Sequence, residues 1–392
     1  MPAPADAPRI LILLGSDWSG INRLPPFLRQ AGFEVDLFCA RQCRLAASNQ
    51  VRAHVSAATH FTDFVADIGR FLAQSSARYR HVLVADDPLL MALSAQRQHP
   101  WAQALLPATG QGLDFLLSKL AFPILAARVG IAVPRSSVQR DPSALRAVAE
   151  QLGYPLILKR PQGFSGQSVH RIDSPARLDG AIQAFRQDGA WLLQEWISGR
   201  EVGATAVWRH GRLLAWFGFE KVRTWPGRFG PASVVRLCAP PQMQLMLEKM
   251  GQVTGFHGLG GADFIRDDNG NLFALEQHGR PNGQFILAEQ AGIDLVAALK
   301  TVFAGTDIDS NGGEPMPTQM PRIQNQHCFP LFPQEAERQL SQQQWRTLKR
   351  WLHQPRYNAM LPLQDPPLLQ AELERLQRLH QEAQANPQAH SK

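Results

Sequence analysis

Short blocks of apolar residues alternate with amphipathic stretches over the first hundred residues of the chain. The block Ile10–Leu14 has the length of a buried strand and ends at Gly15. Two more such blocks follow at Glu34–Phe38 and His81–Ala85, and the stretches between them repeat their apolar positions at helical spacing. This alternation is typical of a parallel sheet covered by helices, so the pattern predicts an N-terminal α/β domain.

Polar residues follow the first and the last of these strands. Ser16 and Asp17 come after the first strand, and Asp86 and Asp87 come after the last. Ligands of parallel sheets bind beyond the carboxyl ends of the strands, which makes these positions candidates for a site. Helix capping is the favoured role for any one of them.

From residue 131 the pattern along the chain changes. Ala132-Val133-Pro134 opens a predicted strand, and Pro142–Leu152 is a predicted helix that ends at Gly153.

The segments that follow have the pattern of antiparallel strands. The strands Pro155–Lys159 and Val169–Ile172 enclose a loop with two glycines, and Glu201–Trp208 and Leu213–Val222 alternate around a His-Gly turn. Lys159 directly precedes the glycine loop, so a phosphate cradled by the loop amides would lie within its reach. The alternative is a surface hairpin with a solvated lysine, because two glycines at this spacing are weak evidence alone.

A second hairpin carries the strongest candidate for a metal site. Asn269-Gly270 readily takes the positive φ angles of a type I′ turn, and with these two residues as the loop Asp263 falls opposite Glu276, Cβ atoms ~5 Å apart. His278 projects from the same face. Opposed carboxylates repel unless a cation lies between them, and magnesium accepts carboxylates and phosphate oxygens together. A register shifted by one residue would instead place the two acids on opposite faces.

The composition excludes several classes of function. The 40 Lys and Arg against 33 Asp and Glu give a net charge of +7, and no basic run is interleaved with aromatic residues, so we expect no nucleic-acid partner. No apolar run approaches the ~20 residues that a membrane span needs, so we expect no membrane partner. Four scattered cysteines do not make a disulfide framework, which favours a cytoplasmic setting.

Five motifs occur in an order that resembles the ATP-grasp superfamily, which includes D-alanine–D-alanine ligase, biotin carboxylase and carbamoyl phosphate synthetase. The resemblance covers roughly residues 100–305, and residues 9–90 resemble the α/β domain that precedes this fold. The motifs are Lys119 with Phe122, Ile131-Ala132-Val133-Pro134, Tyr154-Pro155-Leu156-Ile157-Leu158-Lys159, Leu193 to Glu201, and Ala262-Asp263-Phe264 with Leu275 to Arg280.

The resemblance implies an α/β and α+β architecture with an N-terminal parallel α/β domain, a two-lobed ATP-grasp domain and a C-terminal helical extension. The boundaries that we expect are 1–105 for the N-terminal domain, 106–305 for the ATP-grasp domain with its smaller lobe at about 131–198 and its larger lobe at about 199–305, 306–333 for a linker, and 334–392 for the helical extension.

The resemblance also implies which residues bind ATP. From the residues alone, surface charge explains Glu195 or Glu201 equally well. The positions that match the family are Lys119 and Lys159 for the phosphates, Gly163, Ser165 and Gly166 in the loop that covers the triphosphate, Glu195, Trp196 and Ile197 for adenine, Glu201 for the ribose, and Lys221 as a weaker candidate for the γ-phosphate or the substrate.

At the metal site the resemblance implies that Asp263 and Glu276 bridge magnesium and that Arg280 steadies the acyl phosphate. The family usually has Asn where this chain has His278, and an imidazole nitrogen suits manganese or zinc better than magnesium. Three roles therefore stay open for His278: a changed metal preference, ligation of a single ion, or a hydrogen bond to phosphate. Asn282 is an alternative source of the amide oxygen, and a degenerate, inactive site is a further alternative.

The function that the resemblance implies is that of an ADP-forming ligase. It would use ATP with Mg²⁺ or Mn²⁺ to activate a small carboxylate as an acyl phosphate and join it to an amine, with an amino acid or peptide favoured. The alternatives are a carboxylase or another C–N or C–S ligase, and a nucleotide-binding regulator without turnover. An oxidoreductase is disfavoured, because no Gly-x-Gly-x-x-Gly follows the first strand. The C-terminal helices are expected to pack against the rest of the chain or to mediate a homodimer.

Overall fold

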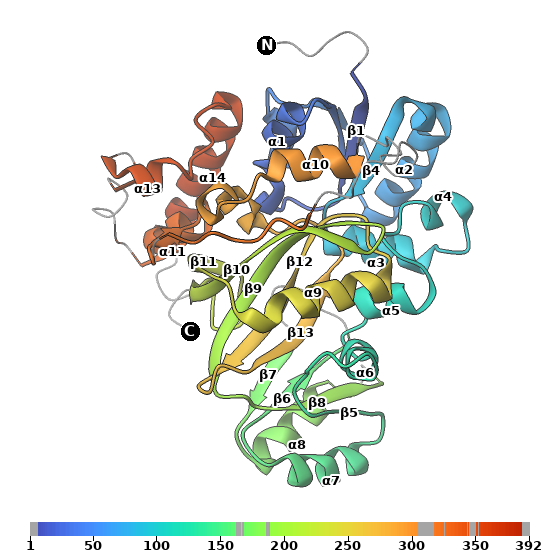
Figure 1. The fold of residues 1–392 in the computed structure, drawn as a ribbon, viewed down its shortest axis with the longest axis vertical. Helices are drawn as coiled ribbons and strands as arrows, with labels where there is room; N and C mark the ends of the chain where they lie inside the picture. The colour runs from blue at the N-terminus through green and yellow to red at the C-terminus, as the bar shows by residue number, and fades with distance from the viewer. Residues whose placement is uncertain are drawn as a thin grey trace.

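The computed structural model of the 392-residue chain describes residues 7–161, 166, 168–185, 189–303, 317–324, 326–342, 344, 350–351 and 353–385. Three sheets form its frame, one in the N-terminal unit and two in the body below it (Figure 1). Within these ranges, no helix is both long enough and apolar enough to cross a bilayer. This arrangement of a parallel N-terminal sheet, antiparallel sheets and C-terminal helices confirms the expected fold class.

The N-terminal sheet is parallel, with the strand order β3-β2-β1-β4. Its central strand β1 is apolar and buried, because helices cover the sheet and leave no face for water. The strands are β1 (Arg9–Leu14), β2 (Glu34–Cys39), β3 (Arg52–Val55) and β4 (Tyr79–Val84), and the helices are η1 (Ser19–Ile21), α1 (Leu24–Gln30), η2 (Arg44–Ala47), α2 (Phe61–Ser75), η3 (Ser76–Arg78) and α3 (Asp87–Ala95).

Three short helices lead from this unit to a small antiparallel sheet with the order β5-β8-β6-β7. Helix α7 begins at Pro142, is capped by the Asp141 carboxylate and ends before Gly153, which confirms the helix predicted for these residues. The strand predicted to open at Ala132 begins instead at Ser136. The elements are α4 (Pro100–Gln103), α5 (Gly110–Leu117), α6 (Phe122–Arg128), β5 (Ser136–Gln139), α7 (Pro142–Leu152), β6 (Leu156–Lys159), β7 (Val169–Ile172), α8 (Pro175–Ala184) and β8 (Trp191–Glu195).

The largest sheet has the order β13-β12-β9-β10-β11-β14 and is covered on both faces. Adjacent residues of β9 show this, because Val207 shares a core with Leu299 of α10, whereas Trp208 shares one with Met250 of α9. The elements are β9 (Gly199–Arg209), β10 (Arg212–Thr224), β11 (Ala232–Cys238), α9 (Pro241–Thr254), β12 (Gly258–Asp267), β13 (Leu272–His278), η5 (Gly283–Leu287), η6 (Glu289–Ala291), α10 (Leu295–Phe303) and β14 (Cys328–Pro330).

The two predicted hairpins of this sheet differ in outcome. His210 and Gly211 join β9 to β10 with φ angles of 47° and 83°, as a two-residue turn requires. The prediction that Asn269-Gly270 forms a two-residue loop is wrong. The N–H of Asp267 donates to the carbonyl of Asn271 over 3.0 Å, so the loop has one residue more, and Gly270 takes the positive φ of 86°.

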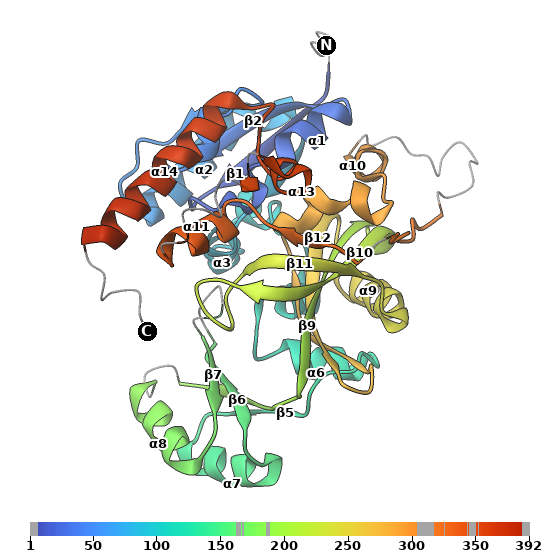
Figure 2. The ribbon, with the colours of Figure 1, turned by 90° about the vertical axis from the view of Figure 1, so that its left-hand side faces the viewer.

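The C-terminal helices lie against the N-terminal unit. Helix α14 packs on α11 and on η2, and Figure 2 shows it running along the blue N-terminal elements. Within the stretch expected to be a linker, β14 pairs with β11, while residues 304–316 lie outside the described residues. The helices are α11 (Gln334–Ser341), α13 (Pro355–Asn358) and α14 (Pro366–Ala385).

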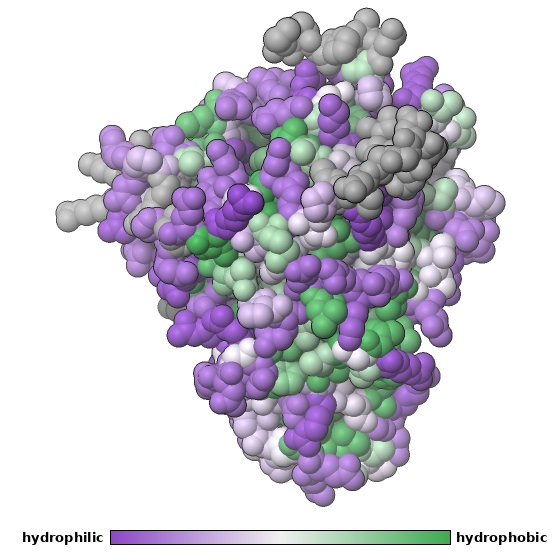
Figure 3. Space-filling view, in the orientation of Figure 1, coloured by the Kyte–Doolittle hydropathy of each residue, from purple (hydrophilic) through white to green (hydrophobic). Residues whose placement is uncertain are grey.

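The surface on the side seen in Figure 3 is unevenly polar. Polar side chains dominate over the N-terminal unit, and apolar side chains gather lower down, over α5 and α6. Ile124 of α6 and Val129, which directly follows this helix, are exposed apolar residues here. Single exposed apolar side chains of this kind are ordinary on a protein surface.

Candidate functional site

A cavity of about 910 Å³ lies between the N-terminal unit, the two lower sheets and the C-terminal helices. Every described residue that the family resemblance nominated for the ATP or metal site lines it, although these residues come from segments far apart in the sequence. They are Lys119, Lys159, Gly166, Glu195, Trp196, Ile197, Glu201, Lys221, Asp263, Glu276, His278 and Arg280. Of the polar residues that follow the N-terminal strands, Asp17 and Asp87 also line it, whereas Ser16 and Asp86 do not. Gly163 and Ser165 lie outside the described residues.

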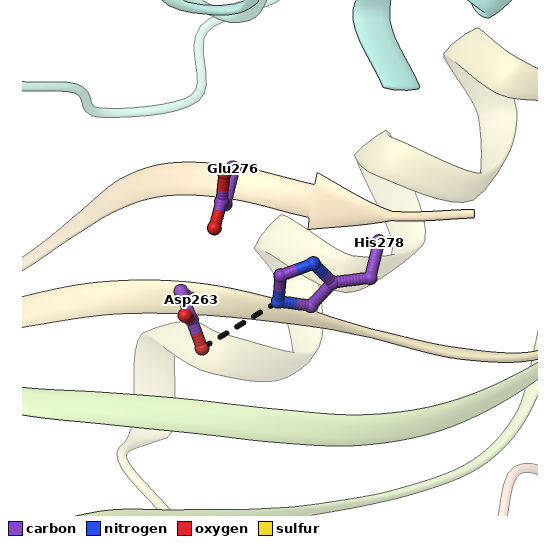
Figure 4. Close-up of side chains that lie close together, drawn as sticks. All are labelled: Asp263, Glu276 and His278. Atoms are coloured by element: carbon purple, nitrogen blue, oxygen red, sulfur yellow. Dashed lines mark ion pairs between the residues drawn. The ribbon is translucent and has the colours of Figure 1, made fainter. Parts of the chain in front are cut away.

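Asp263, Glu276 and His278 form a group that could hold a metal ion. One ligand atom from each lies within 4.8 Å of the others, and the three side chains point toward one another from β12 and β13 (Figure 4). Nε2 of His278 is 3.7 Å from Oδ1 of Asp263. Two carboxylates with one imidazole make a donor set that suits manganese and also accepts magnesium.

A β-bulge brings the two acids opposite each other. Asp263 pairs with Glu276, as predicted, but the next pair is Phe264 with Ala274, which leaves Leu275 as the extra residue. The longer loop shifts the register by one residue, and the bulge shifts it back. The predicted facing of the acids is therefore confirmed, although two features that the prediction lacked produce it.

Lys221 brings a positive charge to this group. Its Nζ lies 2.8 Å from Oδ2 of Asp263 and 3.5 Å from Oε2 of Glu201. Burial acts to lower the pKa of Lys221, but the two carboxylates outweigh burial and raise it. Burial likewise acts to raise the pKa of Asp263, and Lys221 and His278 outweigh it and lower that pKa. Asp263 is thus an anion held between two basic groups.

Two half-buried lysines, Lys119 and Lys159, face the same cavity. Burial lowers the pKa of Lys159 and of Lys119, and the carboxylate of Glu276 acts in the opposite direction on both. Nζ of Lys119 donates to Oγ of Ser168 over 2.5 Å, which ties it to the end of the glycine loop. The ammonium group of Lys159 has no hydrogen bond or ion pair with the described residues. Two ammonium groups at one cavity wall next to carboxylates are suited to bind phosphate oxygens.

The segment after β8 links the two lobes along one wall of the cavity. Glu195 is held by Arg135, whose backbone N–H donates to Oε1 over 2.8 Å and whose Nε lies 2.5 Å from Oε2. The ring of Trp196 lies between two guanidinium groups, with Arg171 at 4.6 Å and Arg228 at 4.7 Å from its centroid. Since the side chains of Glu195 and Trp196 are held in this way, the backbone of this segment is fixed beside the cavity.

Arg280 joins the body of the protein to the N-terminal unit. Its Nη2 lies 2.5 Å from Oδ2 of Asp87, and its guanidinium lies 4.2 Å from the ring centroid of Trp18. Burial acts to raise the pKa of Asp87, and Arg280 outweighs it and lowers that pKa. Asp86 caps α3 by accepting from the N–H of Leu89 over 3.0 Å, so the capping role predicted for this pair applies to Asp86.

Trp18 was not nominated by the sequence. Its ring lies over Gly20, where an added Cβ would approach the ring to 2.1 Å, so only glycine fits there. A glycine two residues after a tryptophan is the only local signal for this arrangement, and it is a weak one. The partner of Trp18, Arg280, is more than two hundred residues away in the sequence, and no local pattern links the two.

Asn282, considered as a further metal ligand, has a structural role. Its Oδ1 accepts from Oγ1 of Thr205 over 2.6 Å, and its Nδ2 donates to the carbonyl of Ala204 over 2.8 Å. The amide is thus hydrogen-bonded at both ends to β9. It fixes the segment after β13 against the sheet.

The C-terminal helices also contribute to the cavity, which the sequence had not indicated. Glu337 of α11 and Arg375 of α14 form an ion pair in its wall. On the facing N-terminal side, Nη1 of Arg44 lies 2.8 Å from Oδ2 of Asp17. These four charged side chains make one end of the cavity polar.

Curated proteins similar to this chain are D-alanine–D-alanine ligases. One from Ectopseudomonas mendocina (strain ymp) is 33% identical over 224 residues, which are 51% of this chain and 69% of the relative. One from Kocuria rhizophila is 28% identical over 134 residues, 33% of this chain and 35% of the relative. The chain thus spans about a third or less of the length of the first curated relatives that it matches. No family model matches it.

Solved structures share its fold. An N5-carboxyaminoimidazole synthetase from Staphylococcus aureus with ADP has a TM-score of 0.64 at 14% identity, covering 88% of this chain and 87% of that one. The biotin carboxylase domain of Hydrogenobacter thermophilus 2-oxoglutarate carboxylase has 0.61 at 15%, covering 75% and 69%. An L-amino acid ligase from Bacillus licheniformis has 0.56 at 17%, covering 76% and 75%.

Proposed function

The chain belongs to the ATP-grasp family, and on that premise we propose that it is an ATP-dependent, ADP-forming ligase that joins a small carboxylate to an amine. One observation carries the proposal. One cavity brings the acids Asp263 and Glu276 together with the half-buried lysines Lys119 and Lys159 and with Arg280. Phosphoryl transfer to a carboxylate needs such an arrangement of cations around oxygen anions.

The residues fit a divalent metal ion and the phosphates of ATP. Asp263, Glu276 and His278 would hold the metal, since their donor atoms already lie within 4.8 Å of one another. A bound metal would supply positive charge that orients and neutralises phosphate oxygens. With a nitrogen donor in the group, we propose that manganese supports the reaction at least as well as magnesium does.

In the first step, an oxygen of the substrate carboxylate attacks the γ-phosphorus of ATP. The bond from that phosphorus to the bridging oxygen breaks, ADP leaves with the electron pair, and an acyl phosphate forms. Lys119 and Lys159 would stabilise the oxygens of the transferring group, and their burial strengthens this interaction because little water competes.

In the second step, the amine attacks the acyl carbon. The bond from carbon to the phosphate oxygen breaks, phosphate leaves, and the nitrogen releases its proton. Arg280 would stabilise the negative charge on the acyl oxygen and on the departing phosphate. Asp87 and Trp18 hold its guanidinium from two sides, so it need not reorganise during the reaction.

The names of the relatives support an amino acid or peptide as the substrate. The similar sequences are named as D-alanine–D-alanine ligases, and one structural neighbour is an L-amino acid ligase. Structural neighbours at 12–15% identity are carboxylating enzymes, which keeps a carboxylase as the second candidate. The sequence relatives favour the ligase. The four cysteines are free, in keeping with a cytoplasmic ligase.

The test is to incubate the purified chain with ATP, magnesium or manganese, and a pooled panel of amino acids, dipeptides and small carboxylates. Phosphate release and the masses of new products are followed together. Substrate-dependent release of phosphate with ADP and a product joined through an amide is the expected result. ATP binding without release under either metal contradicts turnover, and a carboxylated product formed with bicarbonate establishes the second candidate instead.

A further inference from the structure

The end of the cavity away from the nucleotide-binding lobes is built from two parts of the chain that the proposed reaction does not yet use. The N-terminal part contributes Asp17 and Arg44, and the C-terminal helices contribute Glu337 and Arg375. This end adjoins the reaction centre, because Asp17 directly precedes Trp18, whose ring contacts Arg280.

Buried polar contacts hold α11 and α14, the helices that form the C-terminal wall of the cavity, against the N-terminal unit. Glu372 of α14 is 1% exposed, its Oε1 accepts from Nδ2 of Asn22 over 2.7 Å, and its Oε2 lies 3.3 Å from Nε of Arg44. Nε2 of Gln334 donates to Oγ of Ser19 over 3.2 Å at the rim. Buried contacts of this strength place Glu337 and Arg375 at defined positions, as a recognition site requires.

The charges in this wall are mixed in sign and open to the cavity. The side chain of Arg375 is 29% exposed and that of Glu337 is 17% exposed, so both can reach a molecule in the cavity. Because both side chains keep part of their surface open to the cavity, a ligand can reach the pair and compete for each partner. In a ligand with one ammonium and one carboxylate, the ammonium could take the place of Arg375 beside Glu337. The carboxylate could take the place of Glu337 beside Arg375, so that two new ion pairs form.

We propose that this end of the cavity is a substrate subsite, in which Glu337 binds the ammonium and Arg375 the carboxylate of an amino acid or short peptide. The inference rests on the proposed ligase function and extends it. It gives the C-terminal helices a role in recognition, so that these helices decide which substrate is accepted. Apolar residues of α3, among them Met91 and Ala95, lie in the same cavity and suit an uncharged side chain.

Binding is measured by isothermal titration of the full chain, held with ADP and magnesium, against single amino acids and dipeptides. For the tightest ligand, we expect the analogue without the carboxylate (the amino alcohol) and the one without the ammonium (the hydroxy acid) to bind ~10-fold more weakly or worse. Glu337→Gln and Arg375→Gln should each lower the affinity for the unmodified ligand by a similar factor. The affinity for ADP should not change. Glu374→Gln, an exposed position on the same helix, is the matched control.

The double variant Glu337→Arg with Arg375→Glu separates recognition from structure. It restores the ion pair with the charges exchanged, so its melting temperature should return to that of the wild type while the ligand affinity stays low. Recovery of affinity in this variant would show that the pair serves only to hold the helices together and would overturn the inference. So would unchanged affinity in both single variants.

The outcome also separates the inference from the proposed function. A wild-type chain that binds amino acids through this wall but releases no phosphate would contradict the ligase and leave the subsite standing. A chain that joins substrates without one of the two charged groups would leave the ligase standing and contradict the subsite. Binding of no member of the panel would contradict the subsite directly.

Discussion

His278 gives the candidate metal site a nitrogen donor where the family resemblance led us to expect an amide oxygen. Its ring lies beside Asp263, whose other oxygen contacts Lys221. Burial acts to lower the pKa of His278, and Asp263 outweighs burial and raises it. Asp263 therefore meets positive charge on two sides, and each residue of the site can be tested on its own.

Glu276→Gln should abolish turnover while the protein stays folded. The change removes an anionic metal donor and keeps the shape of the side chain. Mutating a residue that only hydrogen-bonds to a metal ligand lowers activity by roughly 10–100-fold, and we expect a larger loss of activity here. ADP release and the melting temperature are measured together. Asp268→Asn, in the exposed loop of the same hairpin, is the control. Activity near that of the wild type would refute the metal assignment.

His278→Asn should change which metal supports the reaction. An amide oxygen suits magnesium better than an imidazole does, so the ratio of the rates with magnesium and with manganese should rise, by roughly 10-fold. Rates are measured over a series of concentrations of each metal. An unchanged ratio would show that His278 does not contact the metal.

Asp87→Asn should lower kcat through Arg280. The ion pair that holds Nη2 is lost, so the guanidinium loses its fixed position, and we expect kcat to fall by about 10–100-fold with little change in the KM for ATP. Steady-state kinetics with the identified substrate give both constants. Asp63→Asn, on the exposed first turn of α2, controls for a lost carboxylate. Equal losses in the two variants would argue against positioning.

The residues at the two ends of the cavity differ in how far the sequence predicts them. Lys159, Asp263 and Glu276 occur within short motifs whose spacing depends on strand geometry, and the structure brings them into one cavity. Arg44 and Arg375 carry no such motif. Their contacts join segments far apart in the chain, and no local periodicity records which distant helix will face which strand.

Among the elements, the hairpin of β12 and β13 shows where local signals are overridden. Asn-Gly favours a two-residue turn, but the Asp267 carboxylate accepts from the N–H of Asn269 over 3.0 Å and of Asn271 over 2.7 Å. These bonds stabilise the longer loop. By contrast, α7 was predictable because Pro142 and Gly153 mark both of its ends.

Gly270→Ala should destabilise the protein by about 1 kcal/mol, because Gly270 has a φ of 86° that a residue with a Cβ rarely adopts. Gly180→Ala, in the middle of α8 with open space around it, should have the opposite sign and stabilise by about 0.4–1 kcal/mol. Urea unfolding measures both. Equal signs would contradict the backbone assignment of the loop.

At the scale of the whole molecule, a row of histidines lies where the N-terminal unit meets the large sheet. The rings of His81 and His257 are 5.6 Å apart, those of His257 and His210 are 4.3 Å apart, and Phe303 covers His81 at 4.6 Å. Burial lowers the pKa of His81 and of His257 to about 4. The folded protein therefore keeps these two rings neutral.

Stability should fall as the pH drops from about 6.5 to about 4. In this window the unfolded chain binds protons at His81 and His257 and the folded chain does not. Each ring therefore lowers the free energy of unfolding by up to about 1.4 kcal/mol for each pH unit of the drop. Unfolding in urea at a series of pH values gives the slope. His81→Phe should reduce it by about half, and an unchanged slope would place the acid sensitivity elsewhere.

The hydrogen bond between Asn22 and Glu372 joins positions 350 residues apart, which has a consequence for the timing of folding. The lobes that carry Lys159, Asp263 and Glu276 are contiguous in the chain and leave the ribosome well before α14 does. Contacts of long sequence separation form late, because the chain must first close a large loop. The growing chain therefore assembles the lobes that carry Lys159, Asp263 and Glu276 first, and it encloses the cavity only when α14 has been synthesised and has docked.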